Sequence, residues 1–235
     1  MLGAVNTTSM LDREVYVYAE VDRLIGLTAG TARRWINGYE RQGTFYPPVI
    51  RVVPRDEDDA WVTWGEFVEA RMIAEFRDIK KVRAKRLRET VDSLRQRYGV
   101  EYPLAHLRPY LSVHDHEVVI GGEKVGLQHH EVARTGQVLI GDAAWIAGRS
   151  ALDLDARGEQ IIAELPADKD IQDIVINPGR FSGQPTFIGT RISPLTIASM
   201  VAAGERREDV AADYGLSLQQ VDHAKVYTER YRLTA

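Results

Sequence analysis

The chain has 235 residues and no cysteine, and this absence excludes several classes of protein at once. Without thiols there can be no disulfide framework, no cysteine nucleophile, no iron–sulfur cluster and no cysteine-liganded zinc finger. Metal sensing through cysteine is excluded for the same reason. Because a chain without disulfides suits a reducing compartment, we expect a cytoplasmic protein.

Long apolar runs are also absent. No window approaches the ~18 apolar residues of a membrane-spanning helix, and the N-terminus lacks the basic stretch and apolar run of a secretory signal. With 44% hydrophobic and 27% charged residues, the composition is typical of a globular protein and argues against disorder. We therefore expect a folded chain with no membrane partner.

The sequence also lacks the common catalytic motifs. It contains no G-x-S-x-G, P-loop, H-E-x-x-H or dinucleotide-binding glycine fingerprint. His114 and His116 would share one face of a strand, and His129 and His130 lie nearby, but no third ligand stands at metal-binding spacing. We therefore predict no enzyme, no bound metal and no cofactor.

The first part of the chain, which we place at residues 1–102, begins with the pattern of a helix-turn-helix unit. Apolar spacing predicts a short helix that ends at Gly26, and Thr28 is suited to cap a second helix that turns Trp35 inward and ends near Gly38. In such units the second helix offers its N-terminal and outward side chains to the major groove of DNA. Here these side chains are Thr28, Thr31, Arg33, Arg34 and Asn37.

The residues that follow predict a two-stranded wing. The prolines 47 and 48 break the helix, and residues 49–53 have the composition of a strand. A polar turn at 56–59 separates this strand from a second one at 61–62. We therefore expect the wing to span about residues 49–62.

Two longer helices are predicted next. Thr63 and Glu66 form a T-x-x-E capping box that opens the first of them. The second is basic, with nine basic and three acidic side chains between Arg77 and Arg97. This run is either a solvated helix face or a surface for a polyanion. Its apolar residues follow heptad-like steps and form a short seam: Leu87, Val91, Leu94 and Tyr98.

This order of elements, over about residues 15–99, resembles the winged-helix domain of MerR-type regulators, which bind operator DNA as dimers. The resemblance implies that the seam packs on another helix, and we expect a homodimer. It also implies roles for five side chains: Arg33, Arg34 and Asn37 would face DNA, and Arg51 and Arg55 would lie in the wing near phosphates.

The middle part, residues 103–173, is acidic and has the pattern of a small β sheet. Paired glycines at 121–122 predict a hairpin between 117–120 and 123–125. A second hairpin is predicted from residues 152–155 and 160–163, with its turn at Arg157–Gly158. This part could serve as an effector domain.

The C-terminal part, residues 174–235, is predicted to contain one strand and three helices. Pro194 suits the first turn of a helix, Gly215 ends the next helix, and Ser217 with Gln220 forms a capping box for the last one. The second and third of these helices also have a helix-turn-helix shape, but acidic side chains make the last helix less favourable toward phosphates. We therefore assign DNA to the N-terminal unit.

The run GQPTFIGTRIS at 183–193, followed by a helix and AAGERREDVAADY at 202–214, closely resembles the domain of unknown function that occurs in VapB-like antitoxins. The resemblance covers about residues 174–232. It implies the antitoxin of a type II toxin–antitoxin pair, which inhibits a PIN-domain ribonuclease and autoregulates its operon by binding operator DNA. Arg230 and Arg232 are then candidates to pair with the toxin's carboxylates, or else they are solvated terminal arginines.

We therefore predict an α+β protein with an N-terminal winged helix-turn-helix, a small central β segment and a C-terminal three-helix domain. An alternative from another class stays open, in which the chain is a MerR-like regulator that responds to a ligand and has no toxin partner.

Overall fold

The computed structural model describes residues 9–56, 58–80, 84–107, 119–120, 123–124 and 143–233. These residues contain helices and small antiparallel sheets, so the predicted α+β class is confirmed. The predicted glycine turn at 121–122 and the four histidines singled out above, His114, His116, His129 and His130, lie outside the described residues.

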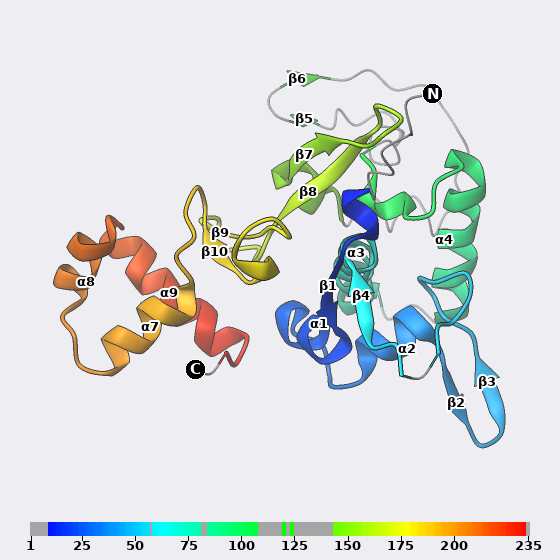
Figure 1. The fold of residues 1–235 in the computed structure, drawn as a ribbon, viewed down its shortest axis with the longest axis horizontal. Coiled ribbons are helices and arrows are strands. Elements are labelled where there is room, and N and C mark those ends of the chain that lie inside the picture. Colours follow the sequence, from blue (N-terminus) through cyan, green and yellow to red (C-terminus); the bar gives the residue numbers. More distant parts are fainter. Residues whose placement is uncertain are drawn as a thin grey trace, which may run out of the picture.

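The N-terminal elements pack around one long helix. In chain order they are η1 (Met10–Asp12), β1 (Glu14–Val17), α1 (Tyr18–Ile25), α2 (Thr31–Asn37), β2 (Tyr39–Arg41), β3 (Thr44–Tyr46), β4 (Trp61–Thr63), α3 (Trp64–Lys80), α4 (Ala84–Tyr98) and η2 (Pro103–Ala105). Figure 1 shows the hairpin of β2 and β3 projecting away from the rest of the molecule, below α4.

The turn between α1 and α2 differs from the prediction in how it is capped. Gly26 ends α1 in the left-handed conformation, as expected. Gly30, and not Thr28, stands at the N-cap of α2. The carboxylate of Asp22 on α1 accepts hydrogen bonds from the backbone N–H groups of Gly30 (2.6 Å) and Ala32 (2.7 Å). The preceding helix therefore supplies the acceptor that the first turn of α2 needs.

The predicted wing is wrong in its position. Residues 49–53 form no strand, and β4 pairs with β1 instead. The reason is that the backbone N–H groups of Val49 and Ile50 both donate to the carbonyl oxygen of Trp35, at 2.7 and 3.0 Å, and so satisfy the end of α2. The hairpin lies earlier in the chain, where β2 pairs with β3 across the turn Gln42–Gly43.

The two longer helices form part of the same core. The predicted capping box is confirmed, because Glu66 Oε2 accepts from the N–H of Thr63 and Thr63 Oγ1 accepts from the N–H of Glu66. In α4 the seam residues Leu87, Val91 and Leu94 are fully buried within this chain. These three seam residues therefore pack inside this chain, and the expected homodimer stays a prediction that the seam does not support by itself.

A four-stranded antiparallel sheet connects the middle of the chain to its C-terminal part. Its strands are β7 (Ala151–Leu154), β8 (Gln160–Pro166), β9 (Ile174–Ile176) and β10 (Thr186–Phe187), in the order β10-β9-β8-β7. The hairpin predicted for residues 152–163 is thereby confirmed. The strands β5 (Val119–Ile120) and β6 (Glu123–Lys124) pair as the first predicted hairpin requires. Since β8 pairs with β9, one sheet crosses the boundary that we placed at residue 174.

Three helices form a lobe at the left of Figure 1, beyond β9 and β10. They are α7 (Pro194–Ala202), α8 (Arg207–Tyr214) and α9 (Leu218–Arg230). Their predicted ends are confirmed: Pro194 begins α7, Gly215 ends α8 in the left-handed conformation, and Ser217 and Gln220 form the capping box of α9. α7 packs along α9.

The loop before β10 joins this lobe to the N-terminal helices. It contains η3 (Phe181–Gly183). The buried hydroxyl of Tyr16 on β1 donates to the carbonyl oxygen of Gly183 at 2.7 Å. Arg23 Nη2 on α1 donates to Gln184 Oε1 at 3.2 Å. The buried apolar residues of both parts form one continuous core, from Leu11 to Tyr227.

A carboxyl group is buried inside this core. Glu69 on α3 is completely buried, and its Oε1 accepts a hydrogen bond from the N–H of Leu104 at 3.0 Å. Its Oε2 has no hydrogen-bond donor among the described residues and lies 3.9 Å from Arg95 Nη2. Burial raises the pKa of Glu69 to about 8, and the charge of Arg95 and the Leu104 N–H lower it only in part.

This burial predicts a stability that falls as pH rises. Between the ordinary pKa of 4.5 and about 8, the folded chain holds a proton on Glu69 that the unfolded chain releases. The free energy of unfolding should fall by up to about 1.4 kcal/mol for each pH unit in this window. Glu69→Gln should remove this dependence. Urea unfolding of both proteins at pH 6 and pH 8 checks it, and parallel losses in the two would contradict it.

Candidate nucleic-acid interface

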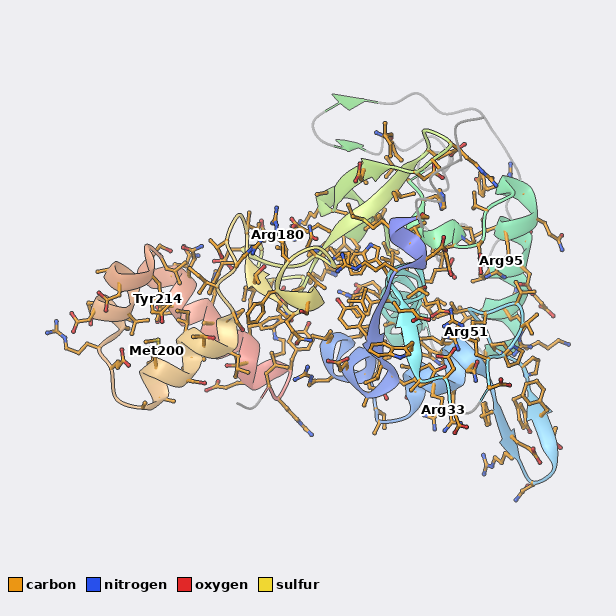
Figure 2. All side chains as sticks on the ribbon, viewed as in Figure 1. Arg33, Arg51, Arg95, Arg180, Met200 and Tyr214 are labelled. Carbon is orange, nitrogen blue, oxygen red and sulfur yellow. The ribbon has the colours of Figure 1, made fainter. Side chains whose placement is uncertain are left out.

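The outward face of α2 and the projecting hairpin form the candidate site. Arg33 and Arg34 occupy the exposed side of α2, opposite the buried Ala32, Trp35 and Ile36. Figure 2 shows Arg33 at the outer edge of the molecule. Arg34 Nη2 donates to Thr31 Oγ1 at 2.9 Å, which holds the guanidinium near the start of the helix. Two arginines on the outer face of a short helix suit contacts to phosphates and to guanine edges.

The seven predicted DNA-contact residues divide into three groups by their exposure. Thr28, Arg33 and Arg34 are exposed. Arg55 is half-buried and already paired, through Nη1, with Glu14 at 3.0 Å and Asp59 at 3.3 Å. The remaining three are buried: Thr31, Asn37 and Arg51.

Asn37 organises the loop after α2 and does not face outward as predicted. Its Oδ1 accepts from the N–H of Arg55 at 2.6 Å and from Arg51 Nη1 at 2.9 Å, while its Nδ2 donates to the Arg55 carbonyl oxygen at 2.9 Å. A buried amide that already makes three such hydrogen bonds has little remaining capacity to hydrogen-bond with a base. The prediction that Asn37 faces DNA is corrected for this reason.

Arg51 is likewise a structural residue. It is only 9% exposed, and its guanidinium meets the Glu66 carboxylate side-on, with Nε to Oε1 at 2.5 Å and Nη2 to Oε2 at 3.0 Å. Further bonds run to the Tyr18 hydroxyl and the Trp61 carbonyl oxygen, both at 2.7 Å. Burial alone would lower the pKa of Arg51, but the hydrogen bonds and charge of Glu66 raise it. The expected place of Arg51 beside phosphates is therefore corrected.

The hairpin carries the residues that the sequence analysis missed. All six of its strand residues are exposed, including three aromatic ones: Tyr39 (37%), Phe45 (55%) and Tyr46 (42%). Tyr39 and Tyr46 stand opposite each other and stack with ring centroids 4.8 Å apart. Since an isolated two-stranded hairpin is marginally stable in water, this pair supports a structure that packs on little else.

A local signal for this hairpin exists in the sequence. Gln42 and Gly43 both have positive φ, at 53° and 72°, as a type I′ turn requires. A glycine after a polar residue, between two short runs that contain Tyr39, Phe45 and Tyr46, is the pattern of a two-residue hairpin. Glutamine is less common than asparagine at the first turn position, which makes the signal weak.

Two grooves flank the hairpin. The first, which we call the α4 groove, has a volume of about 740 Å³ and is lined by residues of α2, the hairpin and the start of α4. The second, the α2 groove, has a volume of about 400 Å³ and includes Arg33, Arg34, Phe45 and Arg55. Both are therefore bordered by Arg34 and by an aromatic side chain of the hairpin.

The basic run on α4 is only partly available to a polyanion. Arg88 donates to the carbonyl oxygens of Pro47 and Pro48, and Arg95 donates to those of Glu101 and Ile50. These arginines hold the loops before and after the helix. Lys85 is exposed and lies 3.9 Å from Glu89. Arg88 and Arg95 thus have structural roles that neither sequence interpretation gave them, and binding of a polyanion by this run stays a prediction.

The candidate toxin contacts lie at the end of α9. Arg230 Nη1 contacts both oxygens of Asp168, at 2.7 and 2.6 Å, and also Asp170 at 3.1 Å. Burial opposes ionisation of Asp168, but N–H donors and Arg230 lower its pKa. Arg230 therefore ties α9 to the loop between β8 and β9. Arg232 is exposed.

Among the residues that the structure covers, no three histidine, aspartate or glutamate side chains are arranged to hold a metal ion. In the same part of the chain, no helix combines the length and apolar character needed to cross a membrane.

Comparison with known proteins gives a family match over the C-terminal part, a relative in sequence and a similar solved structure. Residues 174–228 match the family described as a protein of unknown function (DUF433), the region where the GQPTFIGTRIS run lies. The uncharacterized protein Rv2308 of Mycobacterium tuberculosis is 59% identical over 234 residues, which are 99% of this chain and 98% of that protein. The crystal structure of Rv2018 from the same organism matches with a TM-score of 0.63 at 18% identity, over 92% of this chain and 99% of that chain. At this identity the likeness shows the fold alone.

Proposed function

The chain belongs to the family of the uncharacterized mycobacterial protein Rv2308, and we propose that it is a cytoplasmic DNA-binding antitoxin that binds operator DNA through α2 and the β2–β3 hairpin. The observation that carries the DNA-binding part is the pairing of an arginine-bearing helix face, Arg33 and Arg34, with an exposed hairpin directly after it. Such a pair suits the major groove and the adjacent backbone.

The MerR-like character is part of this proposal. Two short helices joined by a glycine turn, a hairpin and two longer helices follow one another between residues 18 and 98. The hairpin follows α2 directly. This order of elements supports the MerR-like part of the proposal. A homodimer stays part of the proposal, although Leu87, Val91 and Leu94 of the seam are buried within this chain.

The antitoxin part rests on the C-terminal domain. Its family match and its resemblance to VapB-like antitoxins favour a PIN-domain ribonuclease as the partner. Since Arg230 already pairs with Asp168 and Asp170, Arg232 is the better candidate to meet carboxylates of a toxin. The chain itself would perform no catalysis in this scheme and would need no cofactor.

DNA binding is tested by mobility-shift titration on the promoter of the chain's own operon. Arg33→Ala and Arg34→Ala should each weaken specific binding by about 1–3 kcal/mol if they contact bases. Arg206→Ala is the matched control, because Arg206 is also exposed but lies at the N-cap of α8, in the other lobe. Equal affinities for all four proteins would refute the assignment to α2.

The antitoxin part is tested by co-expression with the product of the adjacent reading frame. A stable complex with suppressed ribonuclease activity is expected, and Arg232→Ala should restore part of that activity. Specific promoter binding without any complex would instead support the MerR-like regulator that responds to a ligand.

A further inference from the structure

The α4 groove has the size of a ligand site. Its volume of about 740 Å³ lies in the range of about 300–1,000 Å³ that is usual for small-molecule pockets. Three separate elements line it, since Arg34 comes from α2, Tyr39 and Arg41 from the hairpin, and Lys85 from α4. A ligand held there would contact all three elements at once.

One side of the groove suits an anion. Arg34, Arg41, Lys85 and Arg88 line it together with one acidic residue, Glu40. Arg88 is held by backbone carbonyls, but Arg41 and Lys85 are exposed at the rim.

The other side suits a planar aromatic group. Tyr39 and Tyr46 both line the groove and stack on each other, so at most one face of each ring is left for a ligand. Both rings are partly exposed. Aromatic rings of this kind bind the faces of nucleobases, and the interaction tolerates any base because every base has a π-face.

We propose that the α4 groove binds a nucleotide, with its base against the Tyr39–Tyr46 pair and its phosphates between Arg41 and Lys85. The nucleotide would be either a free nucleoside triphosphate or an unpaired nucleotide of a nucleic-acid strand. This binding does not depend on duplex recognition by α2.

Calorimetric titration of the full chain tests the proposal with four probes: ATP, GTP, tripolyphosphate and a five-nucleotide oligothymidylate. Either nucleoside triphosphate or the oligonucleotide should bind, and binding of only one kind identifies the source. The double variant Arg41→Ala/Lys85→Ala should weaken that binding by about tenfold or more. Tyr46→Leu should weaken nucleotide binding and leave tripolyphosphate unchanged.

Lys225→Ala on α9 is the matched control, since Lys225 is exposed on the other lobe, and circular dichroism verifies that each variant is folded. No binding of any nucleotide probe would overturn the proposal. Tripolyphosphate and ATP binding with equal affinity would also overturn it, because the aromatic pair would then take no part. A failure here would leave the promoter titration unaffected, so the two results are separate.

Discussion

Arg51→Ala is expected to lower the free energy of unfolding by about 3–5 kcal/mol, because it leaves the carboxylate of Glu66 buried without its partner. Glu66 is almost completely buried and has Arg51 as its cationic partner, at 2.5 and 3.0 Å. The substitution also removes donors from the Tyr18 hydroxyl, the Asn37 side chain and the Trp61 carbonyl. The substitution should therefore destabilise three segments together: the loop after α2, β4 and the start of α3.

Urea unfolding followed by circular dichroism measures this loss. Arg33→Ala serves as the control, because Arg33 is exposed on α2 and its removal should change stability by no more than about 0.5 kcal/mol. In the DNA titration we expect the opposite ranking: Arg33→Ala should weaken binding more than Arg51→Ala, since only Arg33 of the two faces outward. An Arg51→Ala protein as stable as the wild type, but with weaker DNA binding, would show instead that Arg51 contacts phosphates as the sequence pattern indicated.

Gly183→Ala should be the second most damaging of the substitutions considered, at about 2–4 kcal/mol. Two separate effects act on this residue. Its φ of +76° strains any L-residue, and a Cβ atom would come within 2.5 Å of the Tyr16 hydroxyl oxygen and 2.7 Å of Val15 Cγ1. Both neighbours belong to β1 at the junction between the lobes.

Gly189→Ala separates these effects. Gly189 has a similar φ of +74°, but a Cβ atom there would meet nothing within 4 Å. Its cost should be the backbone strain alone, about 1 kcal/mol. Thermal unfolding of the two variants gives the difference between their losses of stability. Equal losses would mean that β1 can shift to admit the Cβ atom at residue 183 without a loss of stability. A shift of near-ultraviolet circular dichroism in Gly183→Ala alone would report the disturbed packing of Tyr16.

Helix ends could be predicted from the sequence because their causes are local. The capping residues Thr63 and Ser217 act on groups three residues away, and Gly26 and Gly215 end helices through their own backbone conformation. A pattern within a few residues carries the whole signal. The second hairpin, at residues 152–163, was predicted for the same reason.

The roles of Asn37 and Arg51 could not be predicted in this way. Their partners lie 10 to 33 residues away, and an arginine within a predicted wing strand is exposed in most proteins. The Asp22 carboxylate caps a helix that begins nine residues later in the chain, so no capping pattern identifies it. Contacts of this kind depend on the packing of α1 against α2, and the spacing of residues within a short segment does not predict that packing.

The sheet at the junction has a consequence for the C-terminal domain itself. The family match begins at Ile174, the first residue of β9. β9 has β10 on one side and β8 on the other, and β8 lies outside the matched residues. A polypeptide limited to the matched region would therefore carry a strand with an open edge, and an open edge recruits a strand from another molecule. In this chain β8 acts as a built-in strand donor that occupies this edge of β9, so the edge strands of the sheet are β10 and β7.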